Sequence, residues 1–206
     1  MPVRIKICGI TRYEDARIAA GLGADALGFI FYPESPRYIV PAAAKRIIAQ
    51  LPPFISKTGV FVNETEEFIH AAIRESGIDT IQLHGNESPA FCARMPLPVV
   101  KAFSIDSNAD IDLLGRYSVA GFLLDTWDKS LRGGTGKTFD WSIAEKACRK
   151  YPAVILAGGL GPTNISEALE NVLPYGVDVN SGVEIKPGIK NPKKLKETIT
   201  LAKNWK

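Results

Sequence analysis

The sequence predicts an α/β protein of the (β/α)8 class, a TIM barrel built as one domain over residues 1–206. Short apolar runs alternate with amphipathic helical segments from end to end, which indicates βαβ units around a parallel sheet. Eight such runs can be counted, and no linker, low-complexity segment or change of charge divides the chain. Because eight parallel strands close into a barrel, whereas an open doubly wound sheet more often has about five or six, we expect the barrel.

Strands and helices alternate in regular order along the chain. The predicted strands are residues 3–8, 25–31, 57–62, 79–84, 97–103, 120–125, 153–158 and 176–181. The predicted helical segments include YEDARIAAGL, PAAAKRIIAQL, EEFIHAAIRE, DWSIAEKACRK, PTNISEALENVL and LKETITLAKNW. Their apolar residues recur at the spacing of one helix face, so we expect these helices to cover the outside of the barrel.

Composition narrows the classes of function. The net charge is +3 without a run of five like charges, so we expect no nucleic-acid partner, whereas a mildly basic protein suits a small anionic substrate. The three cysteines lack CxxC spacing, and we expect neither a disulfide framework nor a metal site. The sequence shows no secretory or membrane-spanning segment. We expect a cytoplasmic protein without a membrane partner, either a monomer or a homodimer.

The two-residue period of a strand assigns side chains to the barrel interior. In the first strand, Ile5 and Ile7 should face the helices, while Arg4, Lys6 and Cys8 face inward. The polar residues expected inside from later strands are Gln82, His84, Lys101, Asp178 and Asn180. Most of them lie in the C-terminal halves of their strands, where barrel enzymes place their active sites.

Cys8 ends the first strand in the segment KICGIT and is a candidate catalytic thiol. Its neighbour Lys6 faces the same side, and its charge would favour a thiolate. A free cysteine is more often a small buried hydrophobe, so the residues alone leave both roles open. Cys92 and Cys148 lie on amphipathic segments and are expected to be core residues.

Asp125 ends the apolar strand GFLLD and is a candidate general acid. A carboxyl group partly desolvated at the mouth of a barrel has a raised pKa, which suits that role. Capping of the next element is the alternative. Because its strand lies across the barrel from the first, Cys8 and Asp125 would straddle a bound sugar.

Glycine-rich turns follow the last two strands, at AGGLGPTNI (157–165) and NSGVE (180–184). Backbone N–H groups in such turns bind phosphate, and the loops after strands seven and eight are its usual position in these barrels. The segment RGGTGKT (132–138) is not a nucleotide P-loop, because Leu131 stands where the pattern requires glycine. We expect it to form a loop that closes over the site.

Two further residues are candidates for substrate binding. Arg37 follows Ser35 and Pro36 in a stiff turn, where its guanidinium could bind a substrate carboxylate in bidentate fashion; a solvated surface arginine is the alternative. His84, in QLHG, either contacts substrate or is a hydrogen-bonded core residue. His70, on a helical segment, is expected to be structural.

Together these segments resemble the phosphoribosylanthranilate isomerase family. The resemblance runs almost end to end through KICGIT, GADALGFIFYPESPRYI, GVFVNE, IQLHG, LLDT, GGTGKTFDW, LAGGL, GVDVNSGVE and PGIKN, in the family's order and spacing. It implies a (β/α)8 fold and the Amadori rearrangement of N-(5'-phosphoribosyl)anthranilate to 1-(2-carboxyphenylamino)-1-deoxy-D-ribulose 5-phosphate, in tryptophan biosynthesis. It implies no metal or organic cofactor.

The resemblance also implies roles for individual residues. The family's general base falls on Cys8, its general acid on Asp125, and the arginine that meets the anthranilate carboxylate on Arg37. Its phosphate loops fall on Gly158, Gly159, Ser181 and Gly182. Asn180 stands where many members have serine, and we expect it to bind substrate together with His84 and Asp178.

Two other interpretations are open. A related Amadori isomerase of histidine biosynthesis, or a pentose-phosphate epimerase, would use the same fold. The histidine enzyme would carry an aspartate on the first strand and take a substrate with two phosphates, so Cys8 and Arg37 favour the carboxylate-bearing substrate. A non-catalytic barrel would bind sugar phosphates without turnover.

Overall fold

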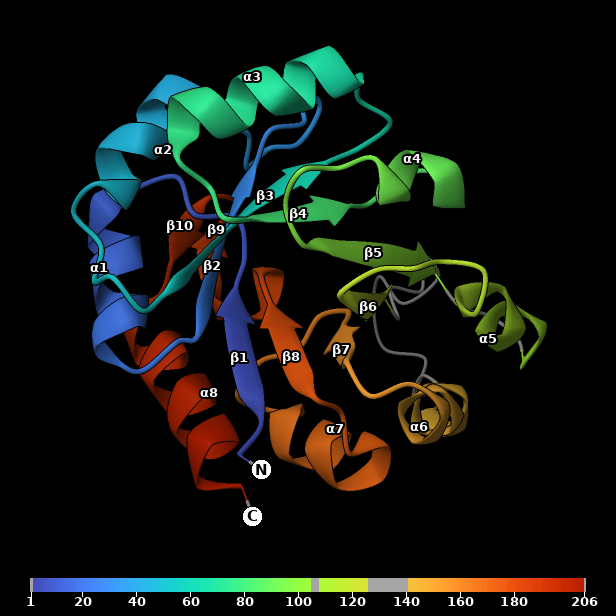
Figure 1. The fold of residues 1–206 in the computed structure, drawn as a ribbon. Coiled ribbons are helices and arrows are strands. Elements are labelled where there is room, and N and C mark those ends of the chain that lie inside the picture. Colours follow the sequence, from blue (N-terminus) through green and yellow to red (C-terminus); the bar gives the residue numbers. More distant parts are fainter. Residues whose placement is uncertain (1, 105–107, 126–140, 206) are drawn as a thin grey trace.

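Eight parallel strands form a closed barrel in chain order, and β1 pairs with both β2 and β8 (Figure 1). The computed structural model describes residues 2–104, 108–125 and 141–205. The strands are β1 Arg4–Ile7, β2 Ala26–Ile30, β3 Ser56–Phe61, β4 Thr80–Leu83, β5 Val99–Ser104, β6 Gly121–Asp125, β7 Val154–Ala157 and β8 Gly176–Val179. Each overlaps its predicted range, and the predicted barrel is confirmed.

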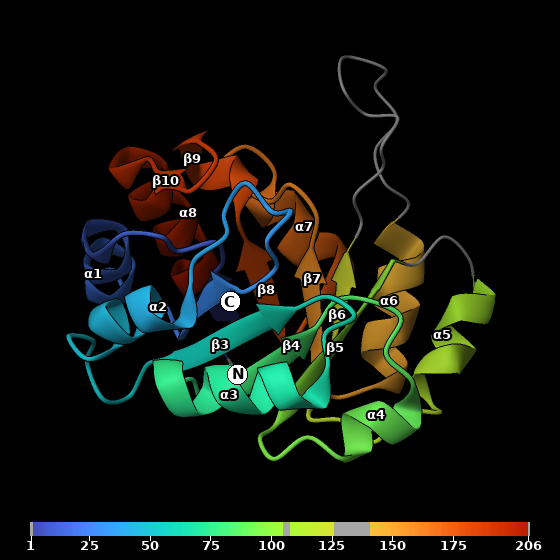
Figure 2. The ribbon, with the colours of Figure 1, turned by 90° about the horizontal axis from the view of Figure 1, so that it is seen from above.

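Helices surround the barrel on its outside (Figures 1 and 2). They are α1 Tyr13–Gly21, α2 Pro41–Ile48, α3 Glu66–Ser76, α4 Pro89–Ala93, α5 Asn108–Leu114, α6 Trp141–Lys150, α7 Ile165–Val172 and α8 Pro192–Asn204. Local chemistry sets the ends of α3: the Thr65 hydroxyl accepts a hydrogen bond from the Phe68 N–H at 3.2 Å, and Gly77 ends the helix at φ 78°. The short helices α4 and α5 are not among the six segments named above as examples, but they agree with the count of about eight helices that the sequence predicts.

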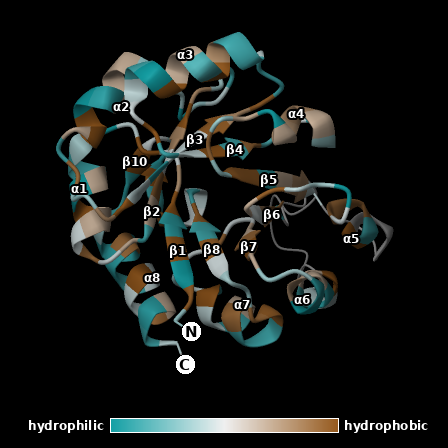
Figure 3. Ribbon diagram, viewed as in Figure 1, coloured by the Kyte–Doolittle hydropathy of each residue, from teal (hydrophilic) through white to brown (hydrophobic). Residues whose placement is uncertain are grey.

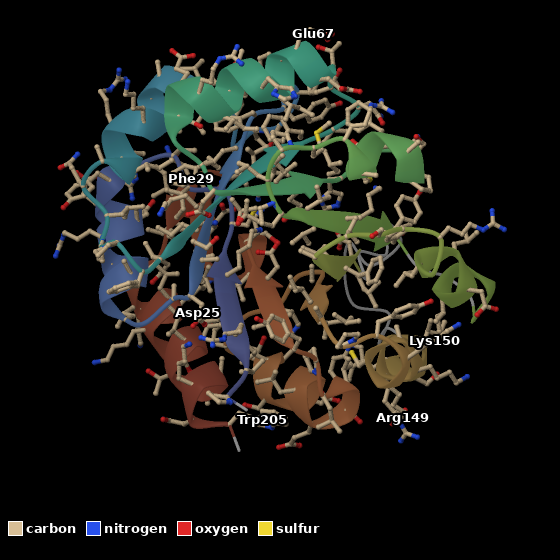
Figure 4. All side chains as sticks on the ribbon, viewed as in Figure 1. Asp25, Phe29, Glu67, Arg149, Lys150 and Trp205 are labelled. Atoms are coloured by element: carbon tan, nitrogen blue, oxygen red, sulfur yellow. The ribbon has the colours of Figure 1, made fainter. Side chains whose placement is uncertain are left out.

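The main hydrophobic core fills the layer between strands and helices. Figure 3 shows hydrophobic residues along β5 and β7, and mixed helices such as α3 and α8. Phe29, Phe31 and Phe61 are fully buried there, and burial of each such side chain contributes about 1.5–3 kcal/mol. On the outer helices Glu67 and Arg149 point away from the barrel (Figure 4). The helices are therefore amphipathic as predicted.

The barrel interior divides into an apolar side and a polar side. The residues on the apolar side are Val100, Ala102, Leu123, Ile155 and Ala157. The polar side carries the buried residues Lys6, Thr58, Gln82 and Asp178. The register of β1 on β8 places Lys6 opposite Asp178. As predicted, Ile5 and Ile7 belong to the outer core, so Lys6 and Cys8 face inward.

Lys101 does not face the interior, contrary to the prediction from its strand. Ala102 occupies the interior cluster, and the Lys101 ammonium lies over the Phe103 ring on the outer side, 5.0 Å from its centroid. The ammonium donates to the Gly85 carbonyl at 2.8 Å and pairs with Glu87 at 3.2 Å. These partners compensate the buried charge of Lys101 on the outer side of the barrel. The polarity of lysine alone could not indicate on which side of the strand such partners lie.

A small hairpin follows β8, in a stretch for which no element was predicted. A 3-10 turn at Ser181–Val183 leads into β9 Glu184–Lys186, which pairs with β10 Ile189–Lys190 in antiparallel fashion. The hairpin is tied to the barrel where the Thr11 hydroxyl donates to the Gly188 carbonyl at 2.5 Å. It therefore covers the region where β1 and β8 end.

The segment 132–138, expected to close over the site, lies outside the described residues. In the ranges that the structure describes, no helix is long and apolar enough to cross a membrane.

Candidate active site

A cavity of about 280 Å³ opens at the C-terminal ends of the strands. Its lining includes nine of the ten residues predicted for the site: Cys8, Arg37, His84, Asp125, Gly158, Gly159, Asp178, Asn180 and Ser181. The tenth, Gly182, follows Ser181 in the chain and packs against the turn after β7. Ile30, Val60, Gln82 and Ala157 complete the lining. The fold thus brings residues from seven strands and their loops to one place.

Cys8 follows β1 directly and is 4% exposed. Its N–H donates to the Val179 carbonyl at 2.9 Å, which continues the pairing of β1 with β8 and fixes the thiol at the cavity. Gly28 of β2 gives the sulfur its space, because a Cβ atom at that position would lie 2.7 Å from Cys8 Sγ. The same Cβ atom would lie 3.1 Å from Lys6 Cε.

The charges around Cys8 act in opposite directions on its thiol. Burial raises the pKa of Cys8, Lys6 and Lys190 lower it, and Asp178 raises it, so that the pKa lies above the ordinary value. Lys6 donates to Asp178 Oδ2 at 2.8 Å, and both side chains are buried. The expectation that Lys6 favours the thiolate is correct in direction, but desolvation outweighs its effect. Desolvation therefore disfavours the thiolate form of Cys8 in this site.

Asp125 ends β6 at the same cavity and faces His84. Asp125 Oδ2 lies 3.5 Å from His84 Nε2, and His84 Nδ1 lies 3.0 Å from the Gln82 amide nitrogen. Because that amide nitrogen is a donor, Nδ1 accepts and the ring hydrogen belongs on Nε2, on the side of Asp125. His84 thus holds a donor close to the carboxyl group, a role that the sequence pattern did not specify.

The glycine turns after β7 and β8 pack against each other, backbone on backbone. Gly158 and Gly159 adopt φ values of 105° and 63°, which favour glycine. A Cβ atom at Gly161 would lie 2.9 Å from the Gly182 carbonyl oxygen, and one at Gly182 would overlap the Leu160 carbonyl. Side chains at these positions would force the turns apart. Exposed backbone in such a pair of turns forms the cradle expected for phosphate.

Arg37 reaches the cavity over Gly9. A Cβ atom on Gly9, which has φ 71°, would lie 2.7 Å from Arg37 Cδ. The guanidinium forms a bidentate pair with Glu184: Nε donates to Oε1 at 2.9 Å and Nη2 donates to Oε2 at 2.7 Å. Arg37 is thus no solvated surface residue.

Glu184 and Lys190 are the residues at the site that sequence reasoning missed. Both lie within segments that carry the family resemblance, GVDVNSGVE and PGIKN. The sequence offers little signal for them, because the same stretch also carries Asp178 and Lys186, and no pattern distinguishes Glu184 and Lys190 from these charges. Only the unpredicted hairpin of β9 and β10 shows that they meet, at 3.0 Å.

The cations near the cavity suit an anionic ligand. Lys6, Arg37 and Lys190 lie at or beside it, each with a carboxylate or amide partner. Among the described residues, no group of three or more His, Cys, Asp or Glu side chains is arranged to hold a metal ion.

The cavity at the C-terminal end, the paired glycine turns and the thiol and carboxyl groups on separate strands define an enzyme of the (β/α)8 class that acts on a small molecule. Comparison with known proteins identifies the family. The sequence model described as N-(5'phosphoribosyl)anthranilate (PRA) isomerase matches residues 5–200. A relative from Geotalea uraniireducens (strain Rf4), named N-(5'-phosphoribosyl)anthranilate isomerase, is 50% identical over 200 residues, or 97% of this chain and 98% of the relative.

Solved structures agree. A phosphoribosyl anthranilate isomerase in complex with reduced 1-(o-carboxyphenylamino)-1-deoxyribulose 5-phosphate matches with a TM-score of 0.88 at 40% identity, over 98% of both chains. Monomers of the dimeric Thermotoga maritima isomerase match with a TM-score of 0.87 at 40% identity, also over 98% of both chains. The chain belongs to the N-(5'-phosphoribosyl)anthranilate isomerase family, and the resemblance seen in the sequence is confirmed.

Proposed function

We propose that this protein catalyses the Amadori rearrangement of N-(5'-phosphoribosyl)anthranilate to 1-(2-carboxyphenylamino)-1-deoxy-D-ribulose 5-phosphate, a step of tryptophan biosynthesis. The observation that carries the proposal is that Cys8, Asp125, Arg37 and the glycine turns line a single cavity in a member of this family. A thiol, a carboxyl group, an arginine and a phosphate cradle are the groups that this substrate requires.

The two anionic ends of the substrate orient it. Its phosphate binds to the turns at Gly158, Gly159 and Ser181, and its anthranilate carboxylate binds to Arg37. The sugar then lies between the two turns and Arg37, beside Asp178 and Asn180. Holding both ends converts binding energy into orientation of the reacting carbons.

Asp125 acts first, as the general acid. It donates a proton to the furanose ring oxygen, the bond between that oxygen and C1 breaks, and the nitrogen lone pair forms a C=N bond, which gives an iminium. His84, whose Nε2 lies 3.5 Å from Asp125 Oδ2, stabilises the carboxylate that remains. A positioned acid of this kind contributes about 10²–10⁴-fold to the rate.

Cys8 acts second, as the general base. Its thiolate removes the proton from C2, and the electrons of that C–H bond move to form an enolamine that tautomerises to the ketone. The iminium acidifies the C2–H bond, and Lys6 and Lys190 stabilise the thiolate against its burial. Because the pKa of Cys8 is raised, the rate should increase as the pH rises through it.

A turnover assay with the purified protein tests this function. Loss of anthranilate-derived fluorescence with phosphoribosylanthranilate, and none with the histidine-pathway intermediate, is the expected result. Binding of the reduced product analogue without turnover would instead indicate a sugar-phosphate-binding barrel.

The roles of the acid and the base have their own test. Replacing Cys8 by serine, or Asp125 by asparagine, should lower kcat by about 10²–10⁴-fold while the reduced product analogue still binds. Wild-type turnover in either variant would remove that residue from the mechanism.

We also propose that the protein forms a homodimer or a monomer, like its relatives. The Thermotoga maritima relative is described as dimeric, and monomers of it have been crystallised. Sedimentation of the purified protein distinguishes the two states.

A further inference from the structure

Arg37 is paired with the carboxylate of Glu184, a residue that has no role in the proposed reaction. The Glu184 side chain is 4% exposed and accepts hydrogen bonds from Arg37 Nε and Nη2, while the Gly188 N–H donates to Glu184 Oε1 at 3.1 Å. The Nη1 group of Arg37 takes part in none of the hydrogen bonds between the guanidinium and Glu184. The pair therefore fixes the plane of the guanidinium and leaves one of its edges for another anion.

Lys190 holds the other side of this carboxylate. Its side chain is 0% exposed, and its ammonium donates to Glu184 Oε1 at 3.0 Å and to the carbonyl and side-chain oxygens of Asn180 at 3.2 and 2.9 Å. All three partners are acceptors, which matches the three N–H donors of a charged ammonium. Burial lowers the pKa of Lys190 and Glu184 opposes this effect. Lys190 thus links Arg37, through Glu184, to Asn180 in the cavity lining.

The hairpin of β9 and β10 brings these two charges together. Glu184 begins β9 and Lys190 ends β10, where they are register partners. The Lys190 N–H donates to Asp15 of α1 at 3.0 Å, which anchors the hairpin to the first helix (Figures 1 and 2). A rigid element therefore supports the side chain of Arg37 from behind, at the mouth of the barrel.

The charges explain why two residues are needed. Glu184 alone would orient Arg37 but neutralise it, and a neutral pair attracts an anionic carboxylate weakly. With Lys190 included, the cluster of Arg37, Glu184 and Lys190 carries one net positive charge. An oriented guanidinium with a remaining positive charge is suited to bind one carboxylate group in a defined direction.

We propose that Glu184 and Lys190 are positioning residues that make the cavity selective for a substrate bearing a carboxylate. They act through Arg37 and Asn180 and do not touch the reacting atoms. This inference rests on the proposed function, because it assigns Arg37 to the anthranilate carboxylate.

The direction in which one substitution changes the affinity for the substrate separates positioning from simple electrostatics. Glu184→Gln keeps the shape of the side chain but removes a negative charge beside Arg37. If charge alone mattered, the variant would bind an anionic substrate more tightly. If Glu184 positions Arg37, the guanidinium loses its bidentate support and binding of the carboxylate weakens.

Two inhibitors measure this effect. One is the reduced product analogue, 1-(2-carboxyphenylamino)-1-deoxyribitol 5-phosphate, and the other is the same molecule without its carboxyl group. Titration calorimetry should show that Glu184→Gln weakens binding of the carboxylated analogue by about 10-fold or more, since a charge-assisted hydrogen bond is lost or misaligned. The Kd of the analogue without the carboxyl group should change by less than about 3-fold.

Lys190→Met should produce the same selective loss of inhibitor binding, and in Glu184→Gln, which leaves the lysines near Cys8 in place, KM should rise more than kcat falls. The matched control is Lys203→Met, which removes a lysine paired with Asp25 at the opposite end of the barrel, and both inhibitors should bind to it as to the wild type. Glu184→Asp, which retains the charge, should recover part of the selectivity.

Three outcomes would overturn the inference. These are tighter binding of the carboxylated analogue by Glu184→Gln, equal weakening of both analogues in both variants, and unchanged selectivity in both. If Glu184→Gln fails to fold, Lys190→Met and Glu184→Asp decide the matter with the same two inhibitors. Failure of the proposed function is recognised separately, because the wild-type protein would then show no turnover and no preference for the carboxylated analogue.

Discussion

At the scale of single residues, the site depends on the buried thiol of Cys8, whose surroundings shift its pKa in opposite directions. Burial disfavours the Cys8 thiolate, while the ammonium groups of Lys6 and Lys190 favour it. The sequence could predict Lys6, two residues away on the same face of a strand. It could not predict the influence of Lys190, which the hairpin of β9 and β10 brings near Cys8 from far along the chain. The net effect of such opposing influences depends on burial, which a strand pattern does not report.

The pH dependence of the reaction follows from this balance. Since the pKa of Cys8 is raised, the wild-type kcat/KM should increase with pH up to and beyond the ordinary thiol pKa of about 8.5. Lys6→Gln removes a charge that lowers this pKa, so the rising limb should move to higher pH. Rate profiles of the two proteins measure the shift, with Lys203→Met as the control that leaves the limb in place. A limb that moves to lower pH in Lys6→Gln would contradict the assignment.

At the scale of elements, the paired glycine turns show how far sequence patterns reach. The two glycine-rich segments and their place after β7 and β8 could be predicted, because glycine content and strand order are visible in the sequence. Their packing, with Gly161 against the Gly182 carbonyl, could not, since it depends on the stagger of neighbouring strands. Lys101 is a second example. Because successive side chains of a strand point to opposite faces, an error of one residue in assigning the faces of β5 reversed the expected direction of this side chain.

Gly182→Ala tests the contact between the turns. The added methyl group would overlap the Leu160 carbonyl, which is backbone and cannot rotate away, so the turns must separate. Inorganic phosphate should then protect the variant less against thermal unfolding than it protects the wild type, and KM should rise by about 10-fold or more. Gly21→Ala is the matched control, because a methyl group there meets no atom within 4 Å. Equal phosphate protection of both variants would show that the turns do not form the phosphate site.

At the scale of the whole molecule, Asp25 joins the two ends of the chain. It accepts hydrogen bonds from Lys203 of α8 at 2.5 Å, from Arg4 at 2.9 Å and from the Ile5 N–H at 2.8 Å, at the base of the barrel (Figure 4). Burial by itself raises the pKa of Asp25, but the bonds from Lys203, Ile5 and Arg4 lower it below the ordinary value. The last helix is therefore held to the first strand by a carboxylate.

Acid should release this connection. Because the pKa of Asp25 is depressed in the folded protein, its contribution to stability is complete above the unfolded value of about 3.9 and is lost as the pH falls through the folded value. Asp25→Asn should lower the free energy of unfolding at pH 7 by about 1–2 kcal/mol, because the site is partly exposed. The difference from wild type should disappear in acid. Denaturant unfolding at a series of pH values measures it, and a difference independent of pH would exclude this role.

The same experiment tests the proposal of a single domain. A closed barrel in which β1 pairs with β8 should unfold in one transition, since separating either half would expose strand edges that the closed sheet keeps paired. Far-ultraviolet circular dichroism and tryptophan fluorescence should therefore give coincident midpoints. Two separate transitions would indicate that the barrel is divided.

The closure of β1 on β8 also brings the two chain ends together, on the side of the barrel away from the cavity (Figures 1 and 2). A short flexible linker could join them, and new ends could be opened at an exposed turn such as the one containing Phe54, which is fully exposed. Such a circularly permuted chain would keep every residue of the cavity in place. For the same reason, a protein fused to either end would sit at the base of the barrel and leave the route of the substrate unobstructed.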